Sequence, residues 1–248
     1  MIDLSQIKTY ILHYTKLTGR RQYMEGVVKQ LNLDATWITD FDQEVMVDDL
    51  LHEYHKPSVE DWNTKVGALW DINAHGHRPL KPSEISLTAK HVDALKRISE
   101  DDAPFGLILE DDVLLASNPE EGLQFQHVLN HYFKDTPSDW DVIFPGNGYG
   151  IGLEHNKQKP VSGQKVYLAN HPASRCTEAM FVKKEAAKKL YDAMKPFTLV
   201  CDWEYGWQFY NLDLKVYWYE PAIITQASHA LDLGTIQGIP EFFRSTLR

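Results

Sequence analysis

The stretch LILEDDVLLAS, residues 107–117, places three adjacent carboxylates, Glu110, Asp111 and Asp112, inside a run of apolar residues. Adjacent carboxylates repel one another and a strand interior offers them little water, so the arrangement costs stability unless a cation lies beside it. In an open α/β sheet, ligands bind at the carboxyl ends of the strands. We therefore expect a metal site here, and the alternative is an acidic turn with a purely structural role.

On both sides of this stretch the hydrophobic pattern alternates between strands and helices. The predicted helices span 20–32, 82–101 and 184–194, and the predicted strands span 7–14, 36–41, 105–115, 140–152, 166–170, 177–184 and 214–228. Ser83 is the candidate cap of the second helix. The β–α–β opening predicts an α/β fold with a mostly parallel central sheet.

The chain offers no repeat, low-complexity block or long linker at which to divide it. Its 248 residues lie near the upper limit for one domain, so we expect a single domain over 1–248. Residues 42–82 are rich in histidine and proline and lack a regular pattern. We expect an irregular insert of loops and short helices there.

Composition excludes several classes of protein. The net charge is −10 and the basic residues are scattered, which argues against nucleic acid as the main partner. The first residues lack the pattern of a signal peptide and no window is apolar enough for a membrane span, which predicts a soluble, cytoplasmic protein. Association with a membrane surface stays open. Two cysteines, Cys176 and Cys201, match neither a disulfide framework nor a zinc pattern.

Polar residues follow the first predicted strand, where a β–α loop would meet a ligand. Tyr14, Thr15, Arg20 and Arg21 occupy this loop and the start of the next helix. Arginine pairs with phosphate through two hydrogen bonds. The alternative is that these arginines lie on a solvated helix surface.

Four segments in order resemble the family 25 glycosyltransferases, which include bacterial lipooligosaccharide galactosyltransferases and collagen hydroxylysine galactosyltransferases. They are YILHYTKLTGRRQYM, EISLTAKHVDALKRI, LILEDDVLL, and AMFVKKEAAKKL followed by CDWEYGWQFYNLDLKVYWYEPAIITQ. Together they cover most of the chain. The resemblance implies a GT-A fold, a nucleotide-binding sandwich in which a DxD-like acidic motif holds Mn²⁺ or Mg²⁺ against the diphosphate of a sugar nucleotide.

The resemblance also implies roles for individual residues. Asp112 is the first metal ligand, while Glu110 and Asp111 orient the ribose or a metal-bound water, with Glu110 as a second candidate ligand. His229, in SHALD at 228–232, is a candidate third ligand, and a surface histidine is an equal alternative. The family's doubled arginine favours Arg20 or Arg21 as a nucleotide contact.

Glu84 and His91 keep the family pattern in the helix before the motif and are expected to face the same cleft. Lys90, beside His91, either joins them or lies on a helix surface of mixed charge. Ser174, Arg175 and Thr177 are candidates to face the acceptor, with a surface turn as the alternative.

An inverting transferase needs a base for the acceptor hydroxyl, and a carboxylate among apolar and aromatic groups has the raised pKa that suits this role. CDWEYGW (201–207) supplies Asp202 and Glu204. In an extended segment both would face one side, whereas in a helix they would diverge by about 200°. The resemblance places Asp202 first as base or acceptor binder.

The function predicted from these residues is metal-dependent transfer of a galactose-like hexose from a UDP-sugar. The acceptor would be a glycan or a lipid-linked saccharide, with the insert at 42–82 facing it. Two alternatives stay open: a sugar-1-phosphate nucleotidyltransferase, and a non-catalytic relative that only binds glycans.

Overall fold

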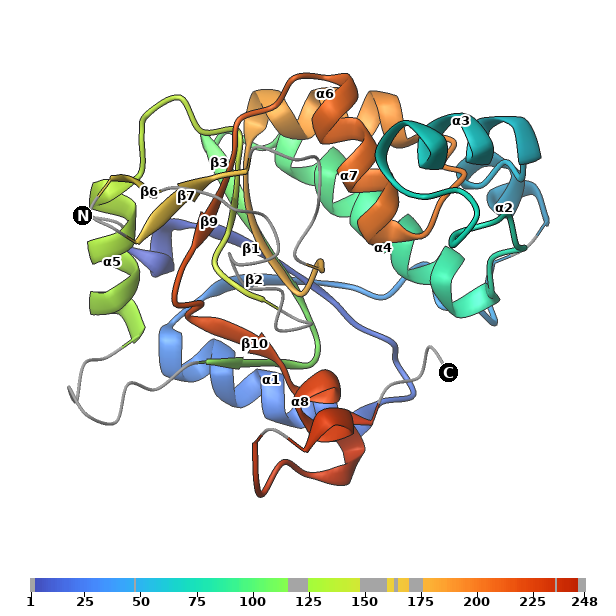
Figure 1. The fold of residues 1–248 in the computed structure, drawn as a ribbon. Coiled ribbons are helices and arrows are strands. Elements are labelled where there is room, and N and C mark those ends of the chain that lie inside the picture. Colours follow the sequence, from blue (N-terminus) through green and yellow to red (C-terminus); the bar gives the residue numbers. More distant parts are fainter. Residues whose placement is uncertain are drawn as a thin grey trace.

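The computed structural model describes residues 3–46, 48–115, 125–147, 160–162, 165–169, 176–234 and 236–244. Its centre is an eight-stranded sheet of order β2-β1-β3-β8-β5-β9-β7-β6 (Figure 1). These strands are β1 (Lys8–Leu12), β2 (Asp34–Ile38), β3 (Phe105–Glu110), β5 (Val142–Phe144), β6 (Pro160–Ser162), β7 (Val166–Leu168), β8 (Ala179–Lys183) and β9 (Val216–Tyr219). A second, two-stranded sheet pairs β4 (Val113–Leu115) with β10 (Ile224–Gln226).

The central sheet is mixed but mostly parallel, as the sequence predicts. β1 pairs in parallel with β2 and β3, and β5 pairs in parallel with β9. Two strands run the opposite way: β8 lies between β3 and β5, and β7 lies between β9 and β6. The other strands of this sheet all run in one direction. The predicted β–α–β opening is confirmed as β1, α1 (Thr18–Leu31) and β2.

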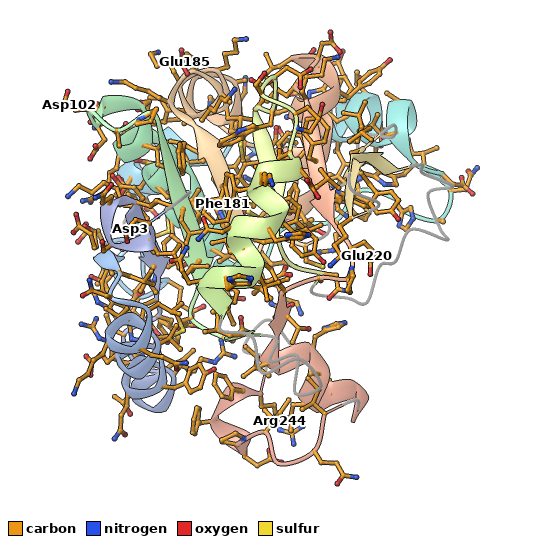
Figure 2. The ribbon with its side chains drawn as sticks, turned by 90° about the vertical axis from the view of Figure 1, so that its left-hand side faces the viewer. Asp3, Asp102, Phe181, Glu185, Glu220 and Arg244 are labelled. Atoms are coloured by element: carbon orange, nitrogen blue, oxygen red, sulfur yellow. The ribbon has the colours of Figure 1, made fainter. Side chains whose placement is uncertain are left out.

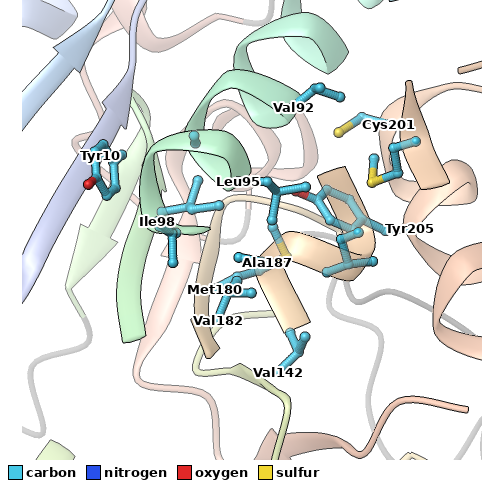
Figure 3. Packing of buried hydrophobic residues seen from close by; sticks show 14 of the residues in the cluster. Tyr10, Val92, Leu95, Ile98, Val142, Met180, Val182, Ala187, Cys201 and Tyr205 are labelled. Carbon is cyan, nitrogen blue, oxygen red and sulfur yellow. The ribbon is translucent and has the colours of Figure 1, made fainter. Parts of the chain in front are cut away.

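Helices cover both faces of the sheet, so the central strands β1, β3, β8, β5 and β9 are buried on two sides. α4 (Pro82–Glu100), α6 (Lys184–Met194) and α7 (Cys201–Asn211) pack on one face, and Figure 3 shows the core they form there, with Leu95, Met180 and Tyr205 in it. α1 and α5 (Phe125–Asp135) pack on the other face. Figure 2 looks onto α5, with Phe181 behind it. The predicted helix at 184–194 is confirmed, whereas α5 is a helix that the sequence did not indicate.

β3 shows how this burial follows from the sequence. Its apolar residues alternate between the two cores, with Ile108 facing α4 and Leu107 and Leu109 facing α1 and α5. Gly106 lets α4 approach closely, since a Cβ atom there would lie 2.6 Å from Ile98 Cγ1. An uninterrupted apolar run is the pattern expected for a strand buried on both faces.

The start of α4 differs from the predicted Ser83 cap. Lys81 is the N-cap residue, Pro82 occupies the first helical position, and the Glu84 carboxylate accepts a hydrogen bond of 2.8 Å from the Lys81 backbone N–H. Proline suits this position because its missing N–H would be unpaired in any case. Glu84 is therefore fixed at the helix start.

The insert forms two short helices, α2 (Asp48–Tyr54) and α3 (Val59–Leu69), as expected for 42–82. α3 begins at Ser58, whose side chain accepts a hydrogen bond from the Asp61 backbone N–H. Trp62 and Val66 of α3 pack with Leu199 in a small third core beside α7. The insert is thus held against the helix that carries the aromatic segment 201–211.

The chain ends with α8 (Ala227–Leu233) and a short 3₁₀ turn, η3 (Glu241–Phe243); another, η1 (Leu4–Gln6), precedes β1. η3 packs against α1 and α8, at the lower end of the molecule in Figure 1. Across the described ranges, every helix is too short or too polar to cross a bilayer.

Candidate active site

The acidic residues lie at the turn between β3 and β4. β3 ends at Glu110, and Asp111 and Asp112 form the turn, so the strand predicted over 105–115 is interrupted there. β4 then pairs with β10, and the Ala227 backbone N–H donates to the Asp112 carbonyl over 2.6 Å. This pairing brings residues 226–229 beside the acidic turn, although they are more than 100 residues away in sequence.

Asp111 is buried and contacts Arg20 and His13. Arg20 Nη1 donates to its Oδ1 over 2.7 Å, and His13 Nδ1 lies 2.7 Å from its Oδ2. Burial raises the pKa of Asp111, but the hydrogen bond from His13 and the charge and hydrogen bond of Arg20 outweigh burial and lower it from its ordinary value. Asp111 therefore stays ionised and anchors the turn.

Asp112 is 2% exposed, and its environment differs from that of Asp111. Its Oδ2 lies 3.5 Å from Arg20 Nη1, while its Oδ1 is buried and has no hydrogen-bond partner among the described residues. Burial raises the pKa of Asp112 to about 7; Arg20 opposes this rise, and the charges of Glu110 and Asp111 add to it. A buried oxygen without a partner is a position where a cation would be favoured.

Glu110 accepts hydrogen bonds from residues on three other segments. Thr177 Oγ1 donates to Oε1 over 2.6 Å, Gln226 Nε2 donates to Oε2 over 3.4 Å, and His91 Nε2 lies 3.4 Å from Oε1. His91 is fully buried, with its other ring nitrogen 3.4 Å from the Tyr205 hydroxyl. His91 thus lies behind Glu110 instead of facing the cleft.

The two candidate arginines occupy opposite environments. Arg20 is buried and donates to the carbonyl oxygens of Phe243 and Arg244 over 2.8 and 3.1 Å, in addition to Asp111. Arg21 lies 3.5 Å from the centre of the Trp37 ring and pairs with the exposed Glu25. The structure therefore brings Arg20 to the acidic turn and places Arg21 on the surface.

The loop after β1 is organised by Asp42. Its carboxylate accepts hydrogen bonds from the Thr15 backbone N–H and hydroxyl over 3.0 and 2.5 Å, and from the buried Lys90 ammonium. Lys90 also donates to the His13 carbonyl. Tyr14 donates from its hydroxyl to Glu44 over 2.5 Å. Lys90 thus lies inside the site, and not on a helix surface.

Two adjoining cavities meet at the acidic turn. The first cavity has an empty volume of about 680 Å³, part of it open to solvent, and its lining includes His13, Tyr14, Arg20, Lys90, Asp111 and Asp112. The second has about 1010 Å³ on the same measure, and its lining includes Arg78, Glu84, Thr177, Asp202, Trp203 and His229. Leu87, Glu110, Gln226 and Ser228 line both. Thr15, Arg21 and His91 line neither, and Ser174 and Arg175 fall outside the described residues.

Asp202 and Glu204 diverge because the segment 201–211 is the helix α7. Asp202 lines the second cavity, and burial raises its pKa to about 6 despite hydrogen bonds from the backbone. Glu204 is fully buried outside both cavities, where it accepts hydrogen bonds from Lys65 and from the Thr198 and Leu199 backbone N–H groups. Its position does not fit the predicted catalytic role, since all of these contacts hold the start of α7.

His229 lines the second cavity but not the first. Burial lowers its pKa, although the charge of Asp232 opposes this shift. Within the described ranges, no group of three His, Cys, Asp or Glu side chains has the arrangement of a metal site. The predicted set of Asp112, Glu110 and His229 is therefore not gathered around one point.

Several site residues were missed from the sequence: His13, Arg78, Gln226 and Ser228. His13 could have been found from the sequence, because it lies at the carboxyl end of the first strand, where a ligand was expected. The others depend on chain segments that meet only in the folded protein.

Among solved structures, the crystal structure of A197 from STIV aligns with a TM-score of 0.40 at 12% identity, covering 86% of this chain and 81% of that chain. The apo crystal structure of mouse Xyloside xylosyltransferase 1 aligns with a TM-score of 0.36 at 8% identity, covering 85% and 83%. No curated protein gives a significant match.

A family model described as glycosyltransferase family 25 (LPS biosynthesis protein) matches residues 6–204. The matched range contains β1, α1, α4, the acidic turn and Asp202, which form most of the two cavities. Gln226, Ser228 and His229 lie beyond it. Since the match covers well over half of the 248 residues, the chain belongs to glycosyltransferase family 25 and is a glycosyltransferase.

Proposed function

We propose that the protein transfers a hexose from a nucleotide sugar, with a divalent cation, to a saccharide acceptor, with inversion at the sugar carbon. The observation that carries the proposal is Asp112, whose Oδ1 is buried without a hydrogen-bond partner among the described residues at the wall of the first cavity. The family match favours glycosyl transfer over nucleotidyl transfer or glycan binding alone.

The residues present fit a Mn²⁺ or Mg²⁺ ion. Such ions take oxygen ligands and often use one or two carboxylates, with substrate phosphates and water completing the shell. Asp112 would hold the ion, with Glu110 as the second candidate because both line the first cavity. The ion, when bound, stabilises the negative charge that develops on the departing nucleoside diphosphate.

The first cavity is the proposed donor site. Arg20 and His13 hold Asp111 and so fix the turn that presents Asp112. Lys90 holds the loop after β1 through Asp42 and the His13 carbonyl. Because Arg20 and Lys90 are already paired inside the protein, their role is to position the acidic turn, which is a different role from the direct phosphate contact predicted for Arg20. We propose a UDP-sugar as donor on the family resemblance.

The second cavity is the proposed acceptor site, with Asp202 as base. Its carboxylate takes the proton of the acceptor hydroxyl while the acceptor oxygen bonds to the sugar carbon. The bond from that carbon to the diphosphate breaks, and the diphosphate leaves with the electron pair. A carboxylate whose pKa is raised to about 6 by burial is still ionised at neutral pH and is a better base than an ordinary aspartate.

Calorimetric titration with UDP, GDP and CMP, each with and without Mn²⁺, tests the donor site. We expect UDP to bind only with Mn²⁺, and Asp112→Asn to lose that binding while keeping its fold. Asp192→Asn, on the exposed face of α6, is the control and keeps it. Metal-independent UDP binding, or equal binding by both variants, would contradict the role of Asp112.

A further inference from the structure

The wall of the second cavity carries the aromatic side chain Trp203, which is packed against residues of the insert. Trp203 of α7 lines this cavity and is partly exposed. Trp70 stacks on it with ring centres 5.2 Å apart and planes 19° apart, and His75 meets it edge-on at 4.9 Å. Trp62 lies 5.9 Å away and donates from its indole N–H to the His75 carbonyl over 3.0 Å. Trp203 is therefore held in place by residues of the insert.

The insert is in turn fixed to α7 by a buried ion pair. Lys65 of α3 donates to both Glu204 oxygens over 2.7 and 3.0 Å, and Glu204 is fully buried. Figure 1 shows α3 beside α7. Three consecutive residues of α7 thus have separate roles: Asp202 lines the cavity, Trp203 contacts the aromatic residues of the insert, and Glu204 anchors α3.

The charges on the cavity wall determine which ligands suit it. Arg78 is the one Lys or Arg among the described lining residues, and it donates two hydrogen bonds to Glu84 over 2.8 and 2.6 Å. Its charge is therefore compensated. Glu110 and Asp202 are the remaining carboxylates among the wall residues that the structure describes. A phosphate or carboxylate on the ligand would meet like charges here, and the described lining residues offer no unpaired Lys or Arg to balance them.

We propose that the second cavity binds an uncharged saccharide as acceptor, with the C–H face of one sugar ring against Trp203 and a hydroxyl at Asp202. This inference rests on the proposed function and specifies its acceptor as neutral. An indole offers a broad apolar surface for such a ring, while the polar wall residues accept its hydroxyls. The insert determines acceptor binding indirectly, since it fixes the indole.

Saturation-transfer NMR on the full chain tests this without any transfer reaction. The probes are methyl β-galactoside, methyl β-glucoside and methyl β-lactoside, and the anionic partners are the methyl glycosides of galacturonic and glucuronic acid. We expect at least one neutral glycoside to bind and the uronosides to bind about tenfold more weakly or not at all. Equal binding of a uronoside, or no binding of any neutral glycoside, would overturn the proposal.

Variants of α7 locate the binding. Trp203→Ala should weaken the neutral glycoside about tenfold, and Trp203→Phe, which keeps an aromatic ring, should weaken it less. Tyr210→Ala is the matched control, because Tyr210 is an aromatic of the same helix that is 57% exposed and lies outside the cavity lining. Unchanged glycoside binding in Trp203→Ala would refute the proposed contact between the sugar ring and Trp203. UDP titration of each variant checks that the first cavity is intact.

The outcomes separate the two proposals. If the unmodified protein shows no metal-dependent UDP binding but binds a neutral glycoside, only the proposed donor site is contradicted. Retained UDP binding with failed glycoside binding contradicts the neutral acceptor alone.

Discussion

Arg20 Nη1 lies 2.7 Å from Asp111 Oδ1, and the same guanidinium donates to the carbonyl oxygens of Phe243 and Arg244. One side chain of α1 therefore joins the acidic turn to the last described residues of the chain. Gly19 permits the contact, because a Cβ atom there would lie 2.9 Å from the Phe242 ring. The geometry of the acidic turn depends on the C-terminal segment through Arg20.

Arg20→Ala should cost about 3–5 kcal/mol of unfolding free energy, because it removes the guanidinium from the buried carboxylates Asp111 and Asp112 and leaves Asp111 with His13 as its remaining side-chain partner. Arg21→Ala should cost about 1 kcal/mol or less, since it removes only a surface ring contact and an exposed pair. Urea denaturation of both variants measures the difference. Equal losses would show that Arg20 is not an anchor.

The Lys65–Glu204 pair should couple strongly. Lys65→Met should cost about 3–5 kcal/mol because it leaves a fully buried carboxylate unpaired, and adding Glu204→Gln should recover part of that loss. The exposed pair Lys188–Asp192 in α6 is the control and should show a coupling close to zero. A double-mutant cycle by chemical denaturation gives both couplings, and similar values would contradict the role of burial.

Two Gly→Ala substitutions should have opposite signs. Gly106→Ala would place a Cβ atom 2.6 Å from Ile98 Cγ1 and should destabilise by about 1–3 kcal/mol. Gly26→Ala lies in α1 with no atom within 4 Å and should stabilise by about 0.5–1 kcal/mol, because alanine favours helix. Thermal unfolding measures both. A stabilised Gly106→Ala would mean that α4 moves away from β3 without loss.

Activity should rise with pH through the titration of Asp202. Burial raises its pKa to about 6, and the base acts only when ionised, so kcat/KM should increase up to about pH 6 and level off above it. Asp202→Asn should lower kcat by about 10²–10⁴-fold and abolish this limb. Asp192→Asn should keep the profile. If kcat/KM of Asp202→Asn still rises with pH in the same range, the titrating group is a different residue.

The same shift predicts a stability effect of defined sign. Because the folded state binds the Asp202 proton more tightly than the unfolded chain, this residue's contribution is most favourable below pH 4 and is lost as pH rises toward 6. Stability measured from pH 4 to 7 should therefore fall more in the unmodified protein than in Asp202→Asn. Parallel curves would show that burial does not perturb this carboxyl.

The sequence alone determined many of the elements and the place of the acidic residues. Apolar runs and helical periodicity identified β1, α1, α4, β3 and α6, because those patterns arise from local burial on a strand or helix face. The order of these elements predicted a mostly parallel sheet, and the carboxyl end of β3 predicted where the carboxylates would lie. The family resemblance was carried by the same segments.

The tertiary structure decided which of several equivalent side chains belong to the site. The sequence left Arg20 and Arg21 undecided and named Asp202 before Glu204. The orientation of α1 and α7 on the sheet brings Arg20 and Asp202 to the cavities, whereas Arg21 lies at the surface and Glu204 is buried elsewhere. The contribution of Gln226 and Ser228 depends on pairing between β4 and β10. Such long-range contacts follow from how complete elements pack, and no short stretch of sequence carries that information.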